Sequence, residues 1–464
     1  MKIKGDEGNM KILDVIHSDG TCDPFNIHET EKVLWNVIKQ IRGFDRAKFH
    51  KEVMPFILKR FESFNYTNIT TRQINELIID ALEEGGHDST LEAYLVFTAQ
   101  KSLIRSKRLP AWVNLGVPYQ VIFDTAVISG MNQCLTLNDL SRIGKNPKDI
   151  EKLMKVFDKN YKMQLKMAAL KVKEKIDDGA RVIIVAGPSS SNKTSTTLWL
   201  TKLLKDEHGI DLNLYPLHVD DYFKEKSEFP IDKYGDPDYE SPNALKIQLI
   251  DQHINQLING EEIEKPIYDF ATSSQIGIEK VKIDTNSIVL IDCLHGLTPE
   301  ITRSIPDEKK IKVYIECMQV LLYDEKYENP YEFRNLFTRW TDWRIMRRSV
   351  RDDQARGTNP YQTFGHWHYV RKWELRSLIP YLIDVDITIN SYNPSEIFFF
   401  RAYLWDKLDD IIEGLEKEGR IDGVIRAKRV KRLLENIPPF SDTSIIPDDS
   451  PMLEFISPEK QKII

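Results

Sequence analysis

The sequence is poor in cysteine and has no long uninterrupted run of apolar residues. Its four cysteines, Cys22, Cys134, Cys293 and Cys317, are scattered and form no C-x-x-C pair. This spacing argues against a disulfide framework or a zinc site and favours reduced packing thiols. No apolar run approaches the roughly eighteen residues of a membrane span, and no apolar signal-peptide core follows the first residues. We therefore expect a cytoplasmic protein with no membrane partner.

A strong charge of either sign is also missing. Of the 464 residues, 41% are hydrophobic and 29% are charged, and the net charge is −7. This balance is that of an ordinary globular chain, long enough for about two or three domains. It gives no support for a nucleic-acid partner.

What the sequence does contain is a glycine-led loop between a predicted strand and a predicted helix. The strand covers 182–186 and the helix 195–205, and this order is the setting of a phosphate-binding P-loop. Backbone N–H groups and the helix N-terminus then face the phosphates. Lys193 is expected to reach the β- and γ-phosphates, and the Thr194 hydroxyl to bind Mg²⁺. The ATP-binding residues predicted here are Gly187, Pro188, Ser189, Ser190, Ser191, Asn192, Lys193, Thr194 and Ser195.

One residue of this loop departs from the G-x-x-x-x-G-K-[ST] pattern. Asn192 stands where a second glycine is usual. Because asparagine is the non-glycine residue best able to adopt a positive φ, we expect the loop still to close.

Acidic residues follow the next two predicted strands, at 212–217 and 287–291. Carboxylates at the carboxyl ends of strands in a doubly wound sheet lie beside bound phosphates. Asp220 could accept the proton of a substrate hydroxyl as it attacks the γ-phosphate, and the alternative is a solvated turn aspartate. Asp292 ends a Walker-B-like strand and is a candidate Mg²⁺ partner.

A basic helical segment lies further along the chain, with acids mainly at its ends. Arginines three or four residues apart share one helix face. Such a face can close over a transferring phosphoryl group and neutralise its charge, whereas an ordinary salt-bridged surface helix has more interspersed acids. The residues are Arg344, Arg347, Arg348 and Arg351, with Asp342 and Asp352.

Residues 1–110 have a pattern of their own. A strand is predicted over 11–17, a hairpin turn at 18–21, and helices over about 28–41 and 49–63. A third helix is expected to be capped by Thr70 or Thr71 and to end at Gly85-Gly86, and a fourth begins near Ser89.

This order resembles an ATP-cone, a small regulatory nucleotide-binding domain, over residues 9–108. The resemblance rests on Asp19-Gly20, Asp23-Pro24-Phe25, Ile74–Gly86 and Ala93-Tyr94. It implies that ATP or dATP bound there tunes activity or oligomeric state. His17-Ser18 and His28-Glu29 stand where the family has phosphate-contacting basic residues, so a working cone and a purely structural one both stay open.

Residues 111–178 are predicted to be a helical connector. Its long helix, about 150–178, carries Leu153, Met154, Phe157, Tyr161, Leu165 and Ala169 at helical spacing. We expect this helix to pack on the following domain rather than to form a partner surface.

The segment 180–403 resembles the uridine kinase / phosphoribulokinase family of P-loop kinases. The resemblance is carried by ordered matches that include 186–194, 220–223, 235–244, 266–270, 295–297, 342–352, 356–357, 367–371 and 390–391. It implies a general base at Asp220, a ribose-hydroxyl acid at Glu240 and base-stacking aromatics at Tyr268 and Phe270. It also implies substrate contacts at Asp221, Tyr222 and Arg344. Its lid arginines fall on Arg344, Arg347, Arg348, Arg351 and Arg356. Of these, Arg344 and Arg348 are expected to be catalytic beside Lys193, and Arg347 and Arg351 are expected to bind ATP.

Three residues depart from this family. Asp292 replaces a glutamate, Trp373 replaces a glycine, and Ser273 lies near the position of a pyrimidine-contacting histidine that is missing. With Asn192, these departures leave a divergent kinase and a nucleotide sensor with a decayed kinase site as alternatives.

Together, the sequence predicts an α/β fold with a P-loop NTPase-type parallel sheet and flanking helices, preceded by a small mainly helical ATP-cone-like domain. The expected domains are 1–110, a connector at 111–178, a kinase core at 179–404 and a helical tail at 405–464 that packs on the core. The expected activity is transfer of the γ-phosphate of ATP, with Mg²⁺, to a hydroxyl of a nucleoside, uridine or cytidine first. A sugar phosphate or another small metabolite is the alternative acceptor. We also expect a homo-oligomer.

Overall fold

The computed structural model describes most of the chain, with gaps. The described residues are 11–17, 21–38, 46–87, 90–91, 93–95, 97–98, 136–210, 214–232, 234–269, 272–319, 321 and 338–460. The chain divides into two compact units, one formed by 1–117 with 326–336 and one by 118–325 with 337–464. Within the described ranges, no helix is both long and apolar enough to span a bilayer.

The first unit combines a small sheet with helices. The strand order is β2-β1-β3, with β1 antiparallel to β2 and parallel to β3. Its elements are β1 (Asp14–Ile16), β2 (Cys22–Pro24), α1 (Ile27–Ile38), α2 (Arg46–Lys48), a π-helical turn (Phe49–Val53), α3 (Met54–Glu62), β3 (Asn68–Thr70) and α4 (Thr71–Glu84). The helix predicted over 49–63 is therefore divided into a π-helical turn and α3. Residues 18–20 of the predicted turn lie outside the described residues.

Local capping explains where α4 begins. The Gln73 N–H donates to the Thr70 hydroxyl at 3.2 Å, and the Thr70 N–H donates to the Gln73 side chain at 2.9 Å. This reciprocal capping box satisfies two helix-end donors, which confirms the cap predicted at Thr70. Gly86, with φ of 67°, follows the end of the helix.

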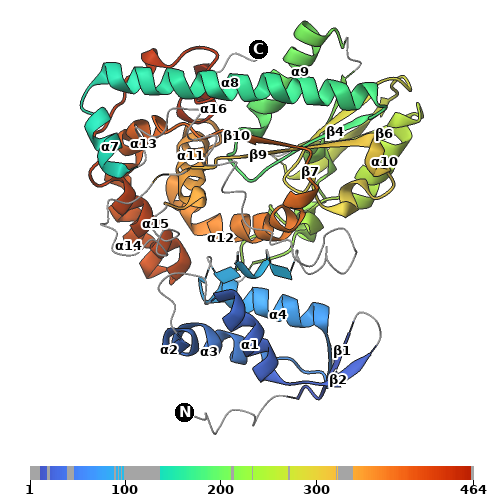
Figure 1. The fold of residues 1–464 in the computed structure, drawn as a ribbon, viewed down its shortest axis with the longest axis vertical. Helices are drawn as coiled ribbons and strands as arrows, with labels where there is room; N and C mark the ends of the chain where they lie inside the picture. The colour runs from blue at the N-terminus through green and yellow to red at the C-terminus, as the bar shows by residue number, and fades with distance from the viewer. Residues whose placement is uncertain are drawn as a thin grey trace. The chain divides into compact units, whose positions relative to one another are not determined.

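The second unit is built on a five-stranded parallel sheet with the order β10-β9-β4-β8-β5 (Figure 1). The strands are β4 (Val182–Ala186), β5 (Leu214–His218), β8 (Ile288–Asp292), β9 (Lys310–Glu316) and β10 (Ile387–Asn390). Every residue of the central strand β4 is buried, as expected when helices cover both faces of a parallel sheet. The α/β class predicted from the sequence is confirmed. A separate antiparallel hairpin joins β6 (Ile263–Asp269) and β7 (Ser274–Val281).

Helices cover the sheet and extend beyond it. On one side, the 31-residue helix α8 (Pro147–Asp177) lies along α9 (Lys193–His208) and β10 (Figure 1). Tyr161, Leu165 and Ala169 of α8 are buried in one core cluster with the strands, so the packing role predicted for this helix is confirmed. The other helices are α7 (Leu137–Ile143), α10 (Ile247–Ile258), α11 (Trp340–Ala355), α12 (Pro360–Ser377), α13 (Glu396–Leu404), α14 (Leu408–Lys417), α15 (Ile421–Leu434) and α16 (Leu453–Ile456).

Candidate functional site

The loop between β4 and α9 has the closed shape that phosphate binding requires. Asn192 has φ of 71° and ψ of 33°, and the helix begins at Lys193. The expectation that asparagine can replace the second glycine is therefore confirmed. Ser190 also has a positive φ, of 60°. Two left-handed residues in a short loop turn successive N–H groups toward one side, as in anion-binding nests.

Gly187 is required by a close approach of two backbones. A Cβ at this position would lie 2.2 Å from the carbonyl oxygen of Ile315 in β9 and 2.8 Å from the Ser191 hydroxyl. No side chain fits there without moving the loop, so the first glycine of the motif fixes the loop against the sheet.

The two predicted metal-binding residues meet at the start of α9. The Thr194 hydroxyl is exposed and hydrogen-bonds to the Asp292 carboxylate at the end of β8. Burial raises the pKa of Asp292 to about 6, and the charge of Lys193 opposes this rise. A hydroxyl and a carboxylate are the hard oxygen donors that Mg²⁺ takes, and Mg²⁺ is usually held by one or two carboxylates together with substrate phosphates. In the described part of the chain, no group of three or more His, Cys, Asp or Glu side chains is placed to hold a metal ion.

The Lys193 side chain folds back over the loop. Its Nζ donates to the carbonyl of Pro188 at 3.1 Å, and the side chain is half-buried. A lysine has several rotatable bonds, so the same Nζ can leave this carbonyl for a phosphate oxygen.

Asp220 lies on the short turn that follows β5. Part of its side chain is exposed to solvent. The surrounding protein partly desolvates the carboxyl group and so raises its pKa. The negative charge of Glu240 raises this pKa further. An accessible carboxylate with a raised pKa is a suitable proton acceptor.

The two residues after Asp220 face other partners. The Asp221 carboxylate accepts from Lys265 at 2.8 Å. Tyr222 has no exposed surface, and its hydroxyl pairs with Nδ1 of His253 at 2.9 Å. In this conformation Tyr222 packs in the core and offers no surface to a substrate.

Arg344, on α11, is buried in an ion-pair cluster under the loop. Its Nε lies 2.8 Å from Glu316, and its Nη2 donates to Glu374 at 2.9 Å. Its Nη1 donates to the carbonyl of Ser189 at 3.2 Å and also to Glu374. The guanidinium of Arg344 therefore holds the P-loop in place through the carbonyl of Ser189.

Arg347 has the same arrangement one turn further along α11. Its Nε and Nη2 each donate to Glu396 at 2.7 Å, which makes a bidentate pair. It also donates to the carbonyls of Ser391 at 2.7 Å and Ser190 at 3.3 Å. The roles predicted for Arg344 and Arg347 at the phosphoryl group stay predictions, since in this state both guanidinium charges are paired with carboxylates.

Arg348 joins the loop to the predicted ribose acid. Its Nη1 donates to the Ser189 hydroxyl at 3.0 Å and to Glu240 at 2.6 Å. Burial alone would raise the pKa of Glu240, but the charge and hydrogen bond of Arg348, together with the charge of Lys193, outweigh it and hold this pKa below its usual value. The predicted lid residues Arg351 and Arg356 lie 2.8 Å and 3.7 Å from Asp352.

A buried histidine positions the backbone at Glu240. The ring of His295 hydrogen-bonds to the carbonyl of Glu240 at 2.9 Å and to the Ser377 hydroxyl at 2.8 Å. Burial lowers the pKa of His295 to about 4, so its ring is neutral at pH 7. The unexpected Trp373 belongs to the same region, where its indole N–H donates to Asp238 at 2.7 Å.

Of the predicted aromatic pair, only Tyr268 can be placed. It is buried, and its ring centre lies 5.7 Å from that of Phe223. Phe270 lies outside the described residues. Ser273, near the position of the missing histidine, has a positive φ of 52°.

Sequence reasoning missed the carboxylates that neutralise the buried arginines. Glu316 ends strand β9, as Asp292 ends β8, so its position at a strand end was a usable signal. Glu374 and Glu396 lie within or at the start of helices, and no local pattern marks them.

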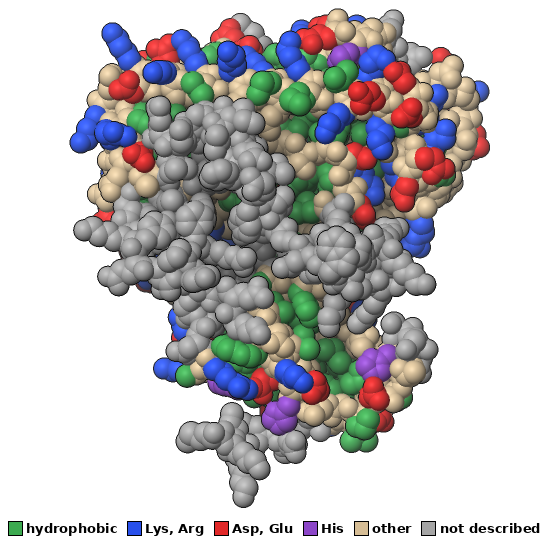
Figure 2. Space-filling view, in the orientation of Figure 1, with side chains coloured by type: hydrophobic (Ala, Val, Ile, Leu, Met, Phe, Trp, Pro, Cys, Tyr) green, Lys and Arg blue, Asp and Glu red, His purple; other side chains and the backbone are tan. Residues whose placement is uncertain are grey.

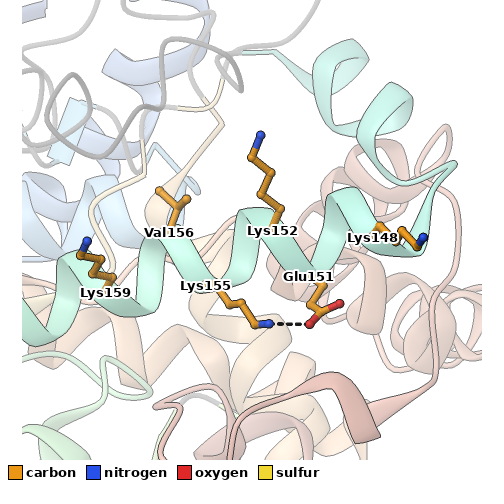
Figure 3. Close-up of a pocket in the computed structure, with 6 residues that line it drawn as sticks. All are labelled: Lys148, Glu151, Lys152, Lys155, Val156 and Lys159. Atoms are coloured by element: carbon orange, nitrogen blue, oxygen red, sulfur yellow. Dashed lines mark hydrogen bonds and ion pairs between the residues drawn. The ribbon is translucent and has the colours of Figure 1, made fainter.

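A shallow pocket of about 520 Å³ lies on α8, away from these residues (Figure 3). Lys and Arg side chains gather along this helix, with acidic and hydrophobic side chains between them (Figure 2). The pocket is lined by Lys148, Glu151, Lys152, Lys155, Val156 and Lys159. None of the predicted site residues lines it, so it is a feature separate from the P-loop.

A parallel sheet whose central strand ends in this loop defines a P-loop nucleotide-binding protein. The family model described as Phosphoribulokinase / Uridine kinase family matches residues 182–328, and the ATP cone domain model matches residues 13–103. The chain belongs to the phosphoribulokinase / uridine kinase family of kinases, and it carries an ATP-cone domain near its start.

Curated relatives agree with this assignment. Uridine kinases from Bacillus pumilus and Geobacillus kaustophilus are 30% and 28% identical to this chain over 176 residues. In each case the match covers 38% of this chain and 69% of the relative. The uridine kinase of Bacillus subtilis is 28% identical over the same shares.

Proposed function

We propose that the protein transfers the γ-phosphate of ATP to a hydroxyl group of a nucleoside, with uridine or cytidine as the first candidates. The observation that carries this proposal is the convergence of four groups at the carboxyl ends of neighbouring strands. Lys193 and Thr194 begin α9, Asp292 ends β8, and Asp220 follows β5. The charge of Lys193 acts on both carboxylates, so the groups belong to one electrostatic site.

Each group has a defined task in this reaction. The loop N–H groups and Lys193 bind the phosphates and hold the γ-phosphoryl in place. Thr194 and Asp292 would hold a magnesium ion, which supplies charge neutralisation to the phosphates when bound. Asp220 accepts the proton from the attacking hydroxyl, and its raised pKa strengthens it as a base.

The acceptor side is the finer part of the proposal. Glu240, held by Arg348, offers a carboxylate that can accept hydrogen bonds from a diol. The relatives named uridine kinases and the aromatic Tyr268 favour a nucleoside. A sugar phosphate or another hydroxylated metabolite is the competing acceptor.

The ATP-cone domain suggests that nucleotide also acts as a regulator. We propose that ATP or dATP binds within residues 13–103 and changes the activity of the kinase unit. Titration of ATP and dATP into full-length Lys193→Ala tests this, because that variant lacks the P-loop lysine. Absence of any remaining nucleotide binding contradicts a working cone.

An acceptor screen tests the function. ATP consumption is measured with Mg²⁺ and a panel of nucleosides, sugar phosphates and other hydroxylated metabolites. A pyrimidine nucleoside should stimulate it most, and Lys193→Ala and Asp220→Asn should each lower the stimulated rate by about 10²-fold or more. Lys202→Ala, on the same helix but half-exposed and paired with Asp206, is the matched control and should remain active. ATP binding without stimulation by any acceptor means that the chain is a nucleotide sensor.

A further inference from the structure

A short segment near the end of the chain, residues 450–456, packs against the P-loop; we refer to it as the tail segment. All seven of its residues are buried. Phe455 is fully buried, and the Met452 sulfur accepts from the Ser395 hydroxyl at 3.4 Å. The tail segment is thus an integral part of the second unit and not a loose extension.

Asn192 is the first link between the tail segment and the loop. Its Nδ2 donates to the carbonyl of Pro451 at 2.9 Å and to Oε2 of Glu454 at 3.3 Å. Only 1% of Asn192 is exposed. The glycine that the motif usually has at this position has no side chain with which to make these bonds.

Glu454 also binds the first turn of α9. The same oxygen, Oε2, accepts from the Ser195 hydroxyl at 2.5 Å. One carboxylate oxygen therefore holds the residues on both sides of Lys193 and Thr194. Its negative charge lies near the N-terminus of α9, where the helix dipole favours it.

Phe455 provides a second route to the loop. The guanidinium of Arg347 lies 4.6 Å from the centre of the Phe455 ring, and the same guanidinium donates to the carbonyl of Ser190. The tail segment thus reaches the two left-handed residues of the loop, Asn192 directly and Ser190 through Arg347.

We infer that Glu454 is a positioning residue for nucleotide binding, and that Asn192 replaces glycine in order to couple the P-loop to the tail segment. Glu454 holds Asn192 in its left-handed conformation and Ser195 in the first turn, so that the loop N–H groups face the phosphates before ATP arrives. This inference rests on the proposed function. Because coupling between two sites is reciprocal, bound ATP should also hold the tail segment more firmly in place.

Point variants of the full-length protein test this coupling by isothermal titration with Mg·ATP and by steady-state kinetics. Glu454→Ala should weaken ATP binding and raise the KM for ATP by about tenfold or more, because hydrogen bonds to a charged group are lost. The KM for the acceptor should not change. Glu454→Gln should bind ATP as the wild type does, since its amide oxygen can accept from both Ser195 and Asn192.

A double-variant cycle distinguishes coupling from general weakening. Asn192→Gly removes the Asn192 bond from the other side and leaves the Ser195 bond in place, so Glu454→Ala should weaken ATP binding less in the Asn192→Gly background than in the wild type. Asp449→Asn is the matched control, because Asp449 is half-exposed, pairs with Lys162 on α8 and does not contact the loop. It should leave ATP binding unchanged.

Several outcomes overturn the inference. The first is that Glu454→Ala binds ATP with wild-type affinity. The second is that Glu454→Gln and Glu454→Ala lose ATP affinity equally, and the third is that the losses of ATP affinity from Asn192→Gly and Glu454→Ala add up in the double variant. If Glu454→Ala does not fold, amide hydrogen exchange on the wild-type protein still tests the coupling. Bound ATP should increase the protection of residues 450–456 from exchange, and unchanged protection contradicts the coupling. Failure of the wild type to bind ATP would instead contradict the proposed function.

Discussion

The bidentate pair between Arg347 and Glu396 should be a large contributor to the stability of the kinase unit. The two side chains are 0% and 1% exposed, and they are joined by two hydrogen bonds of 2.7 Å. Removing one member of a buried pair leaves the other as an unpaired buried charge, at a cost of about 3–5 kcal/mol. We therefore expect Arg347→Met and Glu396→Leu each to lower the free energy of unfolding by about this amount.

The double variant supplies the decisive comparison. With both charges removed, much of the loss should be regained, so the double variant should be at least about 2 kcal/mol more stable than the sum of the single losses predicts. Urea-induced unfolding, followed by tryptophan fluorescence, measures all three, since Trp343 and Trp367 are fully buried in this unit. Lys155→Met, which breaks the exposed pair with Glu151, is the control and should change stability by less than about 1 kcal/mol.

The same experiment separates two roles for Arg347. The arginine pattern in the sequence predicts a residue that faces the transferring phosphoryl group. In that case Arg347→Met would lower activity while leaving the free energy of unfolding near the wild-type value. Near-wild-type stability of both single variants, or simple additivity in the double variant, refutes the reasoning from burial.

Three further predictions follow from the site. Burial lowers the pKa of His295 from 6.5 to about 4. As the pH falls, the imidazole is therefore protonated in the unfolded chain at a higher pH than in the folded protein. The free energy of unfolding should drop by about 2 kcal/mol between pH 7 and pH 5 because of this group. His295→Gln should lose that part of the pH dependence of urea unfolding. Because the pKa of Asp220 is raised, kcat/KM should fall with falling pH at a higher pH than for an ordinary aspartate. Asp220→Asn should lower the rate by about 10²–10⁴-fold and should also remove this fall of kcat/KM at low pH. If the fall at low pH remains in the variant, it is caused by the titration of another group. Gly187→Ala should lose ATP binding in titration because its Cβ meets the Ile315 carbonyl at 2.2 Å, while Gly277→Ala, whose nearest neighbour is at 3.8 Å, should bind normally.

Features encoded by neighbouring residues could be predicted from the sequence. The strand, loop and helix around the P-loop follow one another directly, and so do the strands and acids that lead to Asp220 and Asp292. The conformation of Asn192 could also be predicted, because the φ preference of asparagine is a property of the residue itself. The parallel sheet follows from the alternation of buried strands and helices.

Features that depend on distant partners could not be predicted. The arginines of α11 form a recognisable helix, yet Glu316, Glu374 and Glu396 come from three different elements, and no period in the sequence connects them to Arg344 or Arg347. Tyr222 follows two acids in a site-like run, but its ring is directed into the core. The partner of Asn192 lies 259 residues further along the chain at Pro451.

That separation in sequence also affects the stage of synthesis at which the protein becomes able to bind ATP. Glu454 is 262 residues beyond Asn192, and translation adds about 5–20 residues per second. The P-loop therefore exists on the ribosome for about 13–50 seconds before its tail contacts can form. On our inference, a chain interrupted in this interval would carry the complete motif and still bind ATP poorly, so nucleotide binding would mark chains whose synthesis has passed Glu454.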